Sequence, residues 1–541
     1  MDHPWFDFYD PSVPHHLHYP QMRIFDFLQA QATKNGCKTA LICGDKQKTY
    51  QGLYTESLKF AGYLVENGLL PGDRVAICLP NRIEFVVAYF GTLLAGGIIA
   101  AMNPAYPLSE WRYQVDITRP RFILGEAERF TDLQVLRAEY KIDKVICTGR
   151  TTYTPSKGDC VIFEDLKDRH LGGNTLPEIT HEHAALLQFS GGTTGAPKAA
   201  LALHKNVVAN ILQFSRWLSN MKEGEETFLT VIPLFHVYGM VIGLNVGIAM
   251  GATIVLLPDS KDLGSLLKIV QDHKVTFLPG VPSLYQAIIR HPDVLNGKID
   301  LRSIKACISG SAPLLPETRL QFESLSGAKL VEGYGLSEAP TATHCNPIGG
   351  ENRLGSIGLP LPDVECKIVV PGEDDQALQP GETGELLIRG PQVMQGYFDN
   401  PEETQISLKG GWLHTGDMVR MDSDGYFYVV GRIKELIKVN GLQVWPAEVE
   451  KVLMKFRGVL DAAVAGVPDD MSGECVKAWL VTEDNYPLDL DALQEFCRRH
   501  LATYKIPRDI EFVEHLPRSA VGKVLRRKLV EAHMKKRPGG L

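Results

Sequence analysis

The chain has 541 residues, more than one hydrophobic core usually supports, so we expect two or more domains. Its contents of 44% hydrophobic and 22% charged residues are those of an ordinary soluble globular protein. The net charge of −8 argues against nucleic acid or another polyanion as a partner, whereas local groups could still hold a small anionic ligand.

The cysteines and the chain ends bear on the cellular compartment. The ten cysteines are scattered, and none stands in a C-x-x-C pair. This spacing favours neither a zinc site nor a disulfide framework and is typical of a reducing compartment. The opening MDHPWFDFYD lacks the basic and apolar regions of a secretory signal, and the final RPGGL is not a peroxisomal address. We therefore expect a cytoplasmic protein.

Two long uncharged stretches, residues 85–102 and 237–258, pass a length test for a membrane span. Both are interrupted, the first by Gly96 and Gly97 and the second by Gly251, and a short β-rich run follows each interruption. A buried helix, a glycine cap and a buried strand produce the same composition. We therefore predict core α/β units rather than spans.

The remainder of the chain up to about residue 360 alternates short apolar runs with amphipathic stretches. Runs that end in Gly or Pro occur at 74–80, 275–282, 304–310 and 329–335. This rhythm predicts parallel sheets, with sites at the carboxyl ends of the strands. From about residue 361 onward, short strands and turns predict a smaller β-rich subdomain.

The stretch LLQFSGGTTGAPKAA, residues 186–200, resembles a nucleotide-binding P-loop but lacks its spacing. In a P-loop the lysine directly follows the last glycine, whereas Ala196 and Pro197 separate Gly195 from Lys198. A Gly/Ser/Thr loop offers backbone N–H groups and hydroxyls to an anion, although a polar surface turn has the same composition. Helical spacing of apolar residues after Lys198 places this loop between a strand and a helix. The candidate anion-binding residues are Ser190, Gly191, Gly192, Thr193, Thr194, Gly195 and Lys198.

A second motif, KLVEGYGLSEAP, occupies residues 329–340. Tyr334 stands between Gly333 and Gly335, which let the backbone approach a ligand, and its ring could stack on a base. Ser337 adds a hydroxyl, and Glu338 adds a hard oxygen suited to Mg²⁺. The alternative is a buried tyrosine and a solvated glutamate.

Two further motifs lie nearer the C-terminus. Asp417 stands among uncharged neighbours, where its carboxylate could accept both hydroxyls of a ribose, and Arg432 follows it in the same motif. DSDGY, residues 422–426, lacks the EF-hand spacing and predicts a hairpin turn. Lys523 follows a glycine turn and precedes a basic stretch, where a lysine is otherwise only a solvated charge.

These four motifs occur together and in order, and the combination resembles the acyl-adenylate-forming superfamily from about Phe25 to Lys528. QFSGGTTGAPK, PLFHVYG, LVEGYGLSE and the opening HPWFDFYDPSVPHHLHYP look most like bacterial long-chain fatty acid–CoA ligases. The resemblance implies an α/β fold. A large N-terminal domain of parallel and mixed sheets would span residues 1–433, with its β-rich subdomain at about 361–433. A small mobile α+β domain would span residues 434–541.

The resemblance implies that a carboxylic acid, with a long-chain fatty acid expected, reacts with Mg-ATP to give an acyl-adenylate and then with CoA to give a thioester. ATP, Mg²⁺ and CoA are the expected cofactor and co-substrates, with peripheral membrane contact and a monomer or homodimer left open. An aryl or medium-chain acid is the alternative substrate. A luciferase-like oxygenase is less favoured, as a second activity on the same adenylate. A carrier-protein module is less favoured because the chain stops at Leu541, and a non-enzymatic scaffold because Lys523, Glu338 and Asp417 are retained.

The same resemblance assigns roles to the motif residues. Residues 190–198 would hold the β- and γ-phosphates, Tyr334 would lie against adenine, and Ser337, where the family more often has threonine, would meet the α-phosphate or the carboxylate. Glu338 would bind Mg²⁺, and Asp417 with Arg432 would hold the ribose. Lys523 would bridge the carboxylate and the α-phosphate during adenylation. Rotation at a hinge, Lys434, would replace it by the segment from Lys438 to Gly441.

The acyl group is expected behind PLFHVYGM and SGSAPL. The candidate pocket residues are His236, Tyr238, Gly239, Gly243, Ser309, Gly310 and Ser311. His236 is either a gate or a core residue, and the glycines suggest room for a long chain. Ala199 stands where the family usually has glycine, and we expect this position to lie at the start of a strand or helix, where alanine is tolerated.

Overall fold

A computed structural model describes residues 3–149, 160–168, 175–190, 197–469, 471–483, 488–519 and 521–536. The chain forms two compact units. The first comprises the residues up to 190, 197–365 and 389–413, and the second comprises 366–388 and the residues from 414 onward. The predicted hinge at Lys434 and the boundary between residues 433 and 434 remain predictions.

The first unit contains a nine-stranded sheet whose six central strands are parallel, as the alternating sequence predicted. In spatial order these strands are β14 (Lys329–Gly335), β13 (Ala306–Ser309), β12 (Phe277–Gly280), β10 (Thr227–Thr230), β11 (Thr253–Leu256) and β1 (Thr39–Cys43). Antiparallel strands close both edges: β2 (Lys46–Thr49), β15 (Ala342–Cys345) and β16 (Leu359–Pro360). The helices between them include α1 (Ile24–Lys34), α2 (Tyr50–Glu66), α8 (Leu263–Asp272), α9 (Pro282–Arg290), α10 (Pro292–Leu295) and α11 (Pro316–Ser326).

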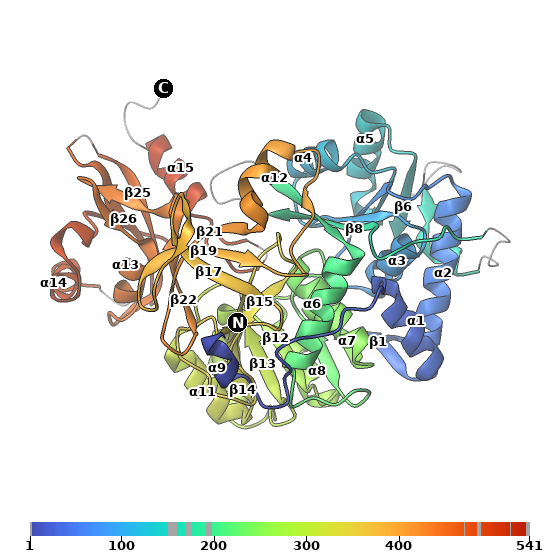
Figure 1. Cartoon of the computed structure of the whole chain (residues 1–541), viewed down its shortest axis with the longest axis horizontal. Coiled ribbons are helices and arrows are strands. Elements are labelled where there is room, and N and C mark those ends of the chain that lie inside the picture. The colour runs from blue at the N-terminus through green and yellow to red at the C-terminus, as the bar shows by residue number, and fades with distance from the viewer. Residues whose placement is uncertain are drawn as a thin grey trace. The chain divides into compact units, whose positions relative to one another are not determined.

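An eight-stranded sheet forms the rest of the first unit. Its strands, in spatial order, are β20 (Gly396–Tyr397), β9 (Lys198–Leu203), β8 (Ala184–Ser190), β4 (Ile98–Ala101), β3 (Arg74–Cys78), β5 (Phe122–Glu126), β6 (Lys144–Thr148) and β7 (Val161–Ile162). Its helices include α3 (Ile83–Leu94), α4 (Leu108–Thr118) and α5 (Phe130–Tyr140), with α12 (Pro401–Ser407) beside β20. Helix α3 packs against α2 (Figure 1).

The two apolar stretches fold as predicted. Helix α3 is followed by Gly96, whose φ is +79°, and by strand β4. The second stretch forms a buried π-helix, Tyr238–Asn245, and α7 (Val246–Ala249), followed by Gly251 at φ +64° and by β11. None of the helices in the described part of the chain is long and apolar enough to cross a membrane.

The predicted position of the glycine-rich loop was wrong. It joins two strands, because β8 and β9 pair antiparallel with Ser190 opposite Lys198, and α6 (His204–Trp217) begins only after β9. Ala199 lies in β9, is 2% exposed and has no positive φ, so alanine is unstrained there, as expected. The loop residues 191–196 themselves lie outside the described residues.

The second unit contains the predicted β-rich part and a smaller α+β part. The first has the sheet β18 (Glu373–Ala377), β17 (Glu365–Val370), β19 (Thr383–Arg389), β21 (Leu413–Met421) and β22 (Phe427–Arg432). The second combines β24 (Leu442–Val444), β23 (Ile437–Val439), β26 (Gly473–Thr482), β25 (Val459–Asp469) and β27 (Asp509–Phe512) with α13 (Pro446–Leu453), α14 (Leu490–His500) and α15 (Arg526–Lys536). As predicted, DSDGY is the turn between β21 and β22.

Candidate active site

The end of β14 carries Tyr334, whose ring stands edge-on to His344 with 5.8 Å between ring centroids. His344 is buried, and burial lowers its pKa to about 3, so this histidine is neutral near pH 7. A Cβ on Gly335 would lie 1.5 Å from the Thr341 carbonyl oxygen. Glycine is therefore required here by the neighbouring backbone, whether or not a ligand also approaches.

Glu338 follows this strand, and the segment around β20 holds it at two points. The Tyr397 hydroxyl donates to Glu338 Oε1 at 2.7 Å, and the Met394 N–H donates to the Glu338 carbonyl at 2.8 Å. Burial and the Glu338 carboxylate both raise the pKa of Tyr397. Ser337 Oγ is 3.5 Å from the Phe189 carbonyl, at the end of β8.

Lys198 joins the same group of side chains. Its ammonium lies 5.5 Å from the centre of the Tyr397 ring and forms an ion pair with Glu403 on α12. The sequence reasoning missed both Tyr397 and Glu403. Of the predicted loop, only Lys198 can be placed, because Gly191–Gly195 and the side chain of Ser190 lie outside the described residues.

The side chains around Glu338 fit a magnesium ion that arrives with a nucleotide. In the described part of the chain, no three His, Cys, Asp or Glu residues gather in a way that could hold a metal by themselves. Mg²⁺ is usually bound through one or two carboxylates and substrate phosphates. Glu338, whose carboxylate accepts a hydrogen bond from Tyr397, can supply one such carboxylate.

In the second unit, β21 and β22 place Asp417 opposite Arg432. The guanidinium contacts the carboxylate through Nε to Oδ1 at 2.7 Å and Nη2 to Oδ2 at 3.4 Å. The predicted pair is thus in direct contact. Arginine fixes the plane of the carboxylate while remaining charged itself.

Lys523 is partly buried in a tight loop of the second unit. The Ser519 N–H donates to the Lys523 carbonyl at 2.8 Å, and the Ser519 Oγ accepts from the Lys523 N–H at 3.2 Å. Burial, reinforced by the charge of Arg432, lowers the pKa of Lys523 to about 8. Close by in sequence, Arg526 pairs with Glu435 and with Glu450.

Lys434, the predicted hinge, and the segment from Lys438 to Gly441 lie at the start of the smaller α+β part. Lys434 and Lys438 are exposed, and the Lys438 N–H donates to Glu474 at 2.7 Å. Gly441 has a φ of +80°, which suits the turn between β23 and β24. Lys434 lies in a short 3-10 helix, Ile433–Glu435, that precedes β23, Lys438 lies within β23, and Gly441 lies at the turn that follows it.

The predicted acyl-pocket residues come from the π-helix and the end of β13. The Tyr238 hydroxyl donates to the Ile308 carbonyl at 2.8 Å, and a Cβ on Gly310 would meet the Tyr238 ring at 3.2 Å. Burial lowers the pKa of His236 to about 4, so it is neutral near pH 7. Ser311 has a φ of +71°, a strained conformation that clusters at functional sites.

The glycines of this region do not adjoin open space. A Cβ on Gly239 would lie 2.4 Å from the Pro233 carbonyl oxygen, and one on Gly243 would lie 3.0 Å from the Thr230 methyl group. The expectation that these glycines make room for a long chain is therefore not supported by the packing. Ser309 differs from these glycines in carrying a polar group: its Oγ is buried and has no hydrogen-bond partner among the described residues.

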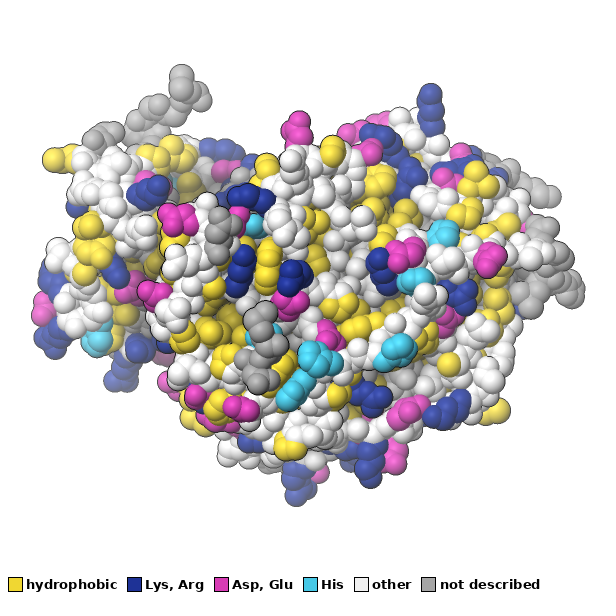
Figure 2. Space-filling view, viewed as in Figure 1, with side chains coloured by type: hydrophobic (Ala, Val, Ile, Leu, Met, Phe, Trp, Pro, Cys, Tyr) yellow, Lys and Arg dark blue, Asp and Glu magenta, His cyan; other side chains and the backbone are white. Residues whose placement is uncertain are grey.

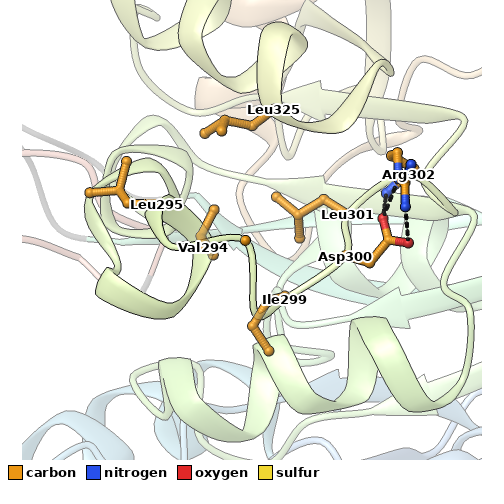
Figure 3. A pocket seen from close by; sticks show the side chains of 8 residues that line it. Val294, Leu295, Ile299, Asp300, Leu301, Arg302 and Leu325 are labelled. Carbon is orange, nitrogen blue, oxygen red and sulfur yellow. Dashed lines mark hydrogen bonds and ion pairs between the residues drawn. The ribbon is translucent and has the colours of Figure 1, made fainter.

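A cavity of about 290 Å³ in the first unit is lined by none of the predicted site residues. Leu295, Leu301 and Leu325 line it, and Figure 3 shows Asp300 and Arg302 bonded to each other at its side. On the face seen in Figure 2, acidic and basic side chains are interspersed among uncharged ones, in keeping with the modest net charge.

Comparison with known proteins gives the family. Residues 28–398 match the family described as AMP-binding enzyme, and residues 448–523 match the AMP-binding enzyme C-terminal domain. The long-chain-fatty-acid–CoA ligase of Bacillus subtilis (strain 168) is 39% identical over 550 residues, which cover 98% of each chain.

Solved structures of the same fold include ATP-bound MatB from Rhodopseudomonas palustris, which is 26% identical with a TM-score of 0.84 and covers 95% of this chain and 99% of its own. The anthranilate CoA ligase AuaEII in complex with anthranoyl-AMP is 26% identical with a TM-score of 0.85, over 95% of this chain and 98% of its own.

Proposed function

The chain belongs to the family of AMP-binding enzymes, and we propose that it is an AMP-forming acid–thiol ligase acting on long-chain fatty acids. In the first half-reaction, a carboxylate oxygen attacks the α-phosphorus of ATP and the bond to the β-phosphate breaks, so that pyrophosphate leaves. In the second, the sulfur of CoA attacks the acyl carbon of the adenylate, the thiol loses its proton, and AMP leaves.

The similarity to a long-chain-fatty-acid–CoA ligase is the observation that carries this proposal. It extends over almost the whole of both proteins. The aryl ligase with a solved structure is less similar in sequence, although it shares the fold. Long-chain acids are therefore favoured over aryl acids.

The chemistry explains why these residue types are needed. A carboxylate and a triphosphate repel each other, so the enzyme must neutralise charge and hold the reactants in line. We assign Lys198 to the β- and γ-phosphates, which leave together. We assign Asp417 with Arg432 to the ribose, Tyr334 to the adenine, and Lys523 to the bridge between the carboxylate and the α-phosphate.

Glu338 is the residue that we assign to Mg²⁺. When bound, the ion would supply positive charge that neutralises the phosphates. Glu338 would hold it through one carboxylate oxygen, and Ser337, the preceding residue, would offer a hydroxyl to the α-phosphate or the acid.

Pyrophosphate release with Mg-ATP, measured across acetate, octanoate, palmitate, oleate and coumarate with and without CoA, tests the proposal. We expect the highest rate with palmitate or oleate, and turnover that depends on CoA. A preference for coumarate would replace the long-chain assignment by an aryl one. Absence of release with every acid would contradict the ligase and favour a scaffold.

A further inference from the structure

Tyr397 is fixed by the same strand that carries Lys198. In β20, Tyr397 pairs with Ala200 of β9, and the Phe398 N–H donates to the Ala199 carbonyl at 2.8 Å. On its other side, the Tyr397 N–H donates to Thr404 Oγ1 at 2.8 Å. The tyrosine backbone is therefore bonded to β9 and to α12, so its ring has a defined place.

That ring lies between the two charged groups of the candidate phosphate site. Its hydroxyl donates to Glu338 Oε1, and its face is within cation–π distance of the Lys198 ammonium. A hydrogen bond from a hydroxyl to a carboxylate is charge-assisted and roughly twice as strong as a neutral one. Because it engages Oε1, it sets the direction in which the carboxylate presents Oε2.

We infer that Tyr397 is a positioning residue, which orients Glu338 toward the metal of the nucleotide and supports Lys198 beside the phosphates. This inference rests on the proposed function, because it takes Glu338 as the metal-binding carboxylate. Groups that orient the ligands of a metal strongly affect the affinity for that metal. The Tyr397 hydroxyl orients the carboxylate that would bind the metal, and the Tyr397 ring contacts the Lys198 ammonium. Substitutions that remove only the hydroxyl, or the hydroxyl and the ring together, can therefore separate the two effects.

Tyr397→Phe keeps the ring and removes only the hydroxyl, whereas Tyr397→Leu removes both. Calorimetric titration of the full-length enzyme with ATP, once with Mg²⁺ and once with EDTA, gives the factor by which the metal strengthens nucleotide binding. We call this ratio of the two affinities the metal factor. We expect Tyr397→Phe to lower that factor about tenfold and to leave binding of metal-free ATP within about twofold of wild type. Tyr397→Leu should also weaken metal-free ATP about threefold.

Tyr19→Phe is the matched control, since the Tyr19 hydroxyl donates to Asp363 Oδ2 at 2.8 Å in another partly buried tyrosine–carboxylate pair. We expect it to leave the metal factor unchanged. Equal weakening of ATP binding with and without Mg²⁺ in Tyr397→Phe would show a merely structural role and overturn the inference. An unchanged metal factor in Tyr397→Phe would overturn it too.

Glu338→Gln separates this inference from the proposed function and gives a second test if a Tyr397 variant folds poorly. We expect Glu338→Gln to abolish most of the metal factor, and Tyr397→Phe to have no further effect on it in that background. If Glu338→Gln lowers the factor and Tyr397→Phe does not, only the role of Tyr397 fails. If Glu338→Gln leaves the factor intact, the metal assignment fails, and the role of Tyr397 fails with it.

Discussion

Asp417 and Arg432 face each other across the antiparallel strands β21 and β22, with the guanidinium Nε 2.7 Å from Asp417 Oδ1. The Asp417 side chain is 4% exposed, whereas that of Arg432 is 33% exposed. Burying a charged group is costly unless it is paired and hydrogen-bonded, and Arg432 meets that need for Asp417. Arg432 also holds the Asp417 carboxylate in one plane, as a carboxylate that accepts both hydroxyls of a ribose has to be.

Substitution of Asp417 should remove discrimination between ribose and deoxyribose nucleotides. We expect wild-type enzyme to use 2′-deoxyATP at least about tenfold less efficiently than ATP, because one charge-assisted hydrogen bond is lost. Asp417→Ala should use the two nucleotides equally and both poorly, as measured by kcat/KM for pyrophosphate release. Persistent discrimination in Asp417→Ala would show that another group contacts the ribose.

Lys523→Ala should cripple adenylation and leave thioester formation from a supplied acyl-adenylate largely intact. In the proposed mechanism the adenylation step needs the positive charge of the lysine, whereas the second step does not use it. Single-turnover pyrophosphate release and thioester formation measure the two steps separately. Lys528→Ala, an exposed lysine on α15, serves as control and should affect neither. Equal loss in both steps would contradict two separate uses of the C-terminal part.

The pH dependence of adenylation provides a further check on Lys523. Its pKa of about 8 means that the ammonium is charged below this pH and becomes neutral as the pH rises through it. We therefore expect kcat/KM for ATP in adenylation to fall above about pH 8. Lys523→Arg should be slower but should lack this decline, because arginine remains charged. The same decline in Lys523→Arg would assign it to another group.

The sequence predicted the α/β units well because their periodicity is local. Asp417 and Arg432, named together from one motif, lie opposite each other on neighbouring strands, whereas the role of Lys523 stays a prediction. The sequence misplaced the glycine-rich loop because KAALAL, which forms β9, is rich in alanine and has little intrinsic strand preference. Only its pairing with β8 makes it a strand. Tyr397 was missed for a similar reason: its partner Glu338 is 59 residues away, and no local pattern marks the contact.

Lys198 forms an ion pair with Glu403 in the described structure. If Lys198 binds a phosphate as proposed, this ion pair has to break when the nucleotide binds. Glu403→Gln should therefore tighten ATP binding about threefold, the effect of a partly exposed ion pair, and less at high salt. Titration with ATP at two salt concentrations measures this. Glu402→Gln makes the same charge change on the same turn of α12 and controls for net charge. Weaker ATP binding in Glu403→Gln would show that Glu403 supports Lys198 instead.

Gly239 tests whether the glycines of the π-helix serve packing or the acyl tunnel. A Cβ there would lie 2.4 and 2.5 Å from the carbonyl oxygens of Pro233 and Ile232, which are backbone atoms and cannot easily move away. Gly239→Ala should therefore lower the free energy of unfolding by about 3 kcal/mol, as overpacking does, and leave the preferred chain length unchanged. Urea unfolding and the acid panel measure the two effects.

Gly62→Ala is the control for Gly239→Ala, because Gly62 lies in α2 and a Cβ there would have no atom within 4 Å. Replacement of a helical glycine by alanine without a clash should stabilise the protein by about 1 kcal/mol. If Gly239→Ala instead unfolds like wild type and shifts the preference from palmitate to octanoate, the glycine borders the acyl chain. The backbone at Pro233 and Ile232 would then have moved to accommodate the new methyl group, and the acyl tunnel would run along this face of the π-helix.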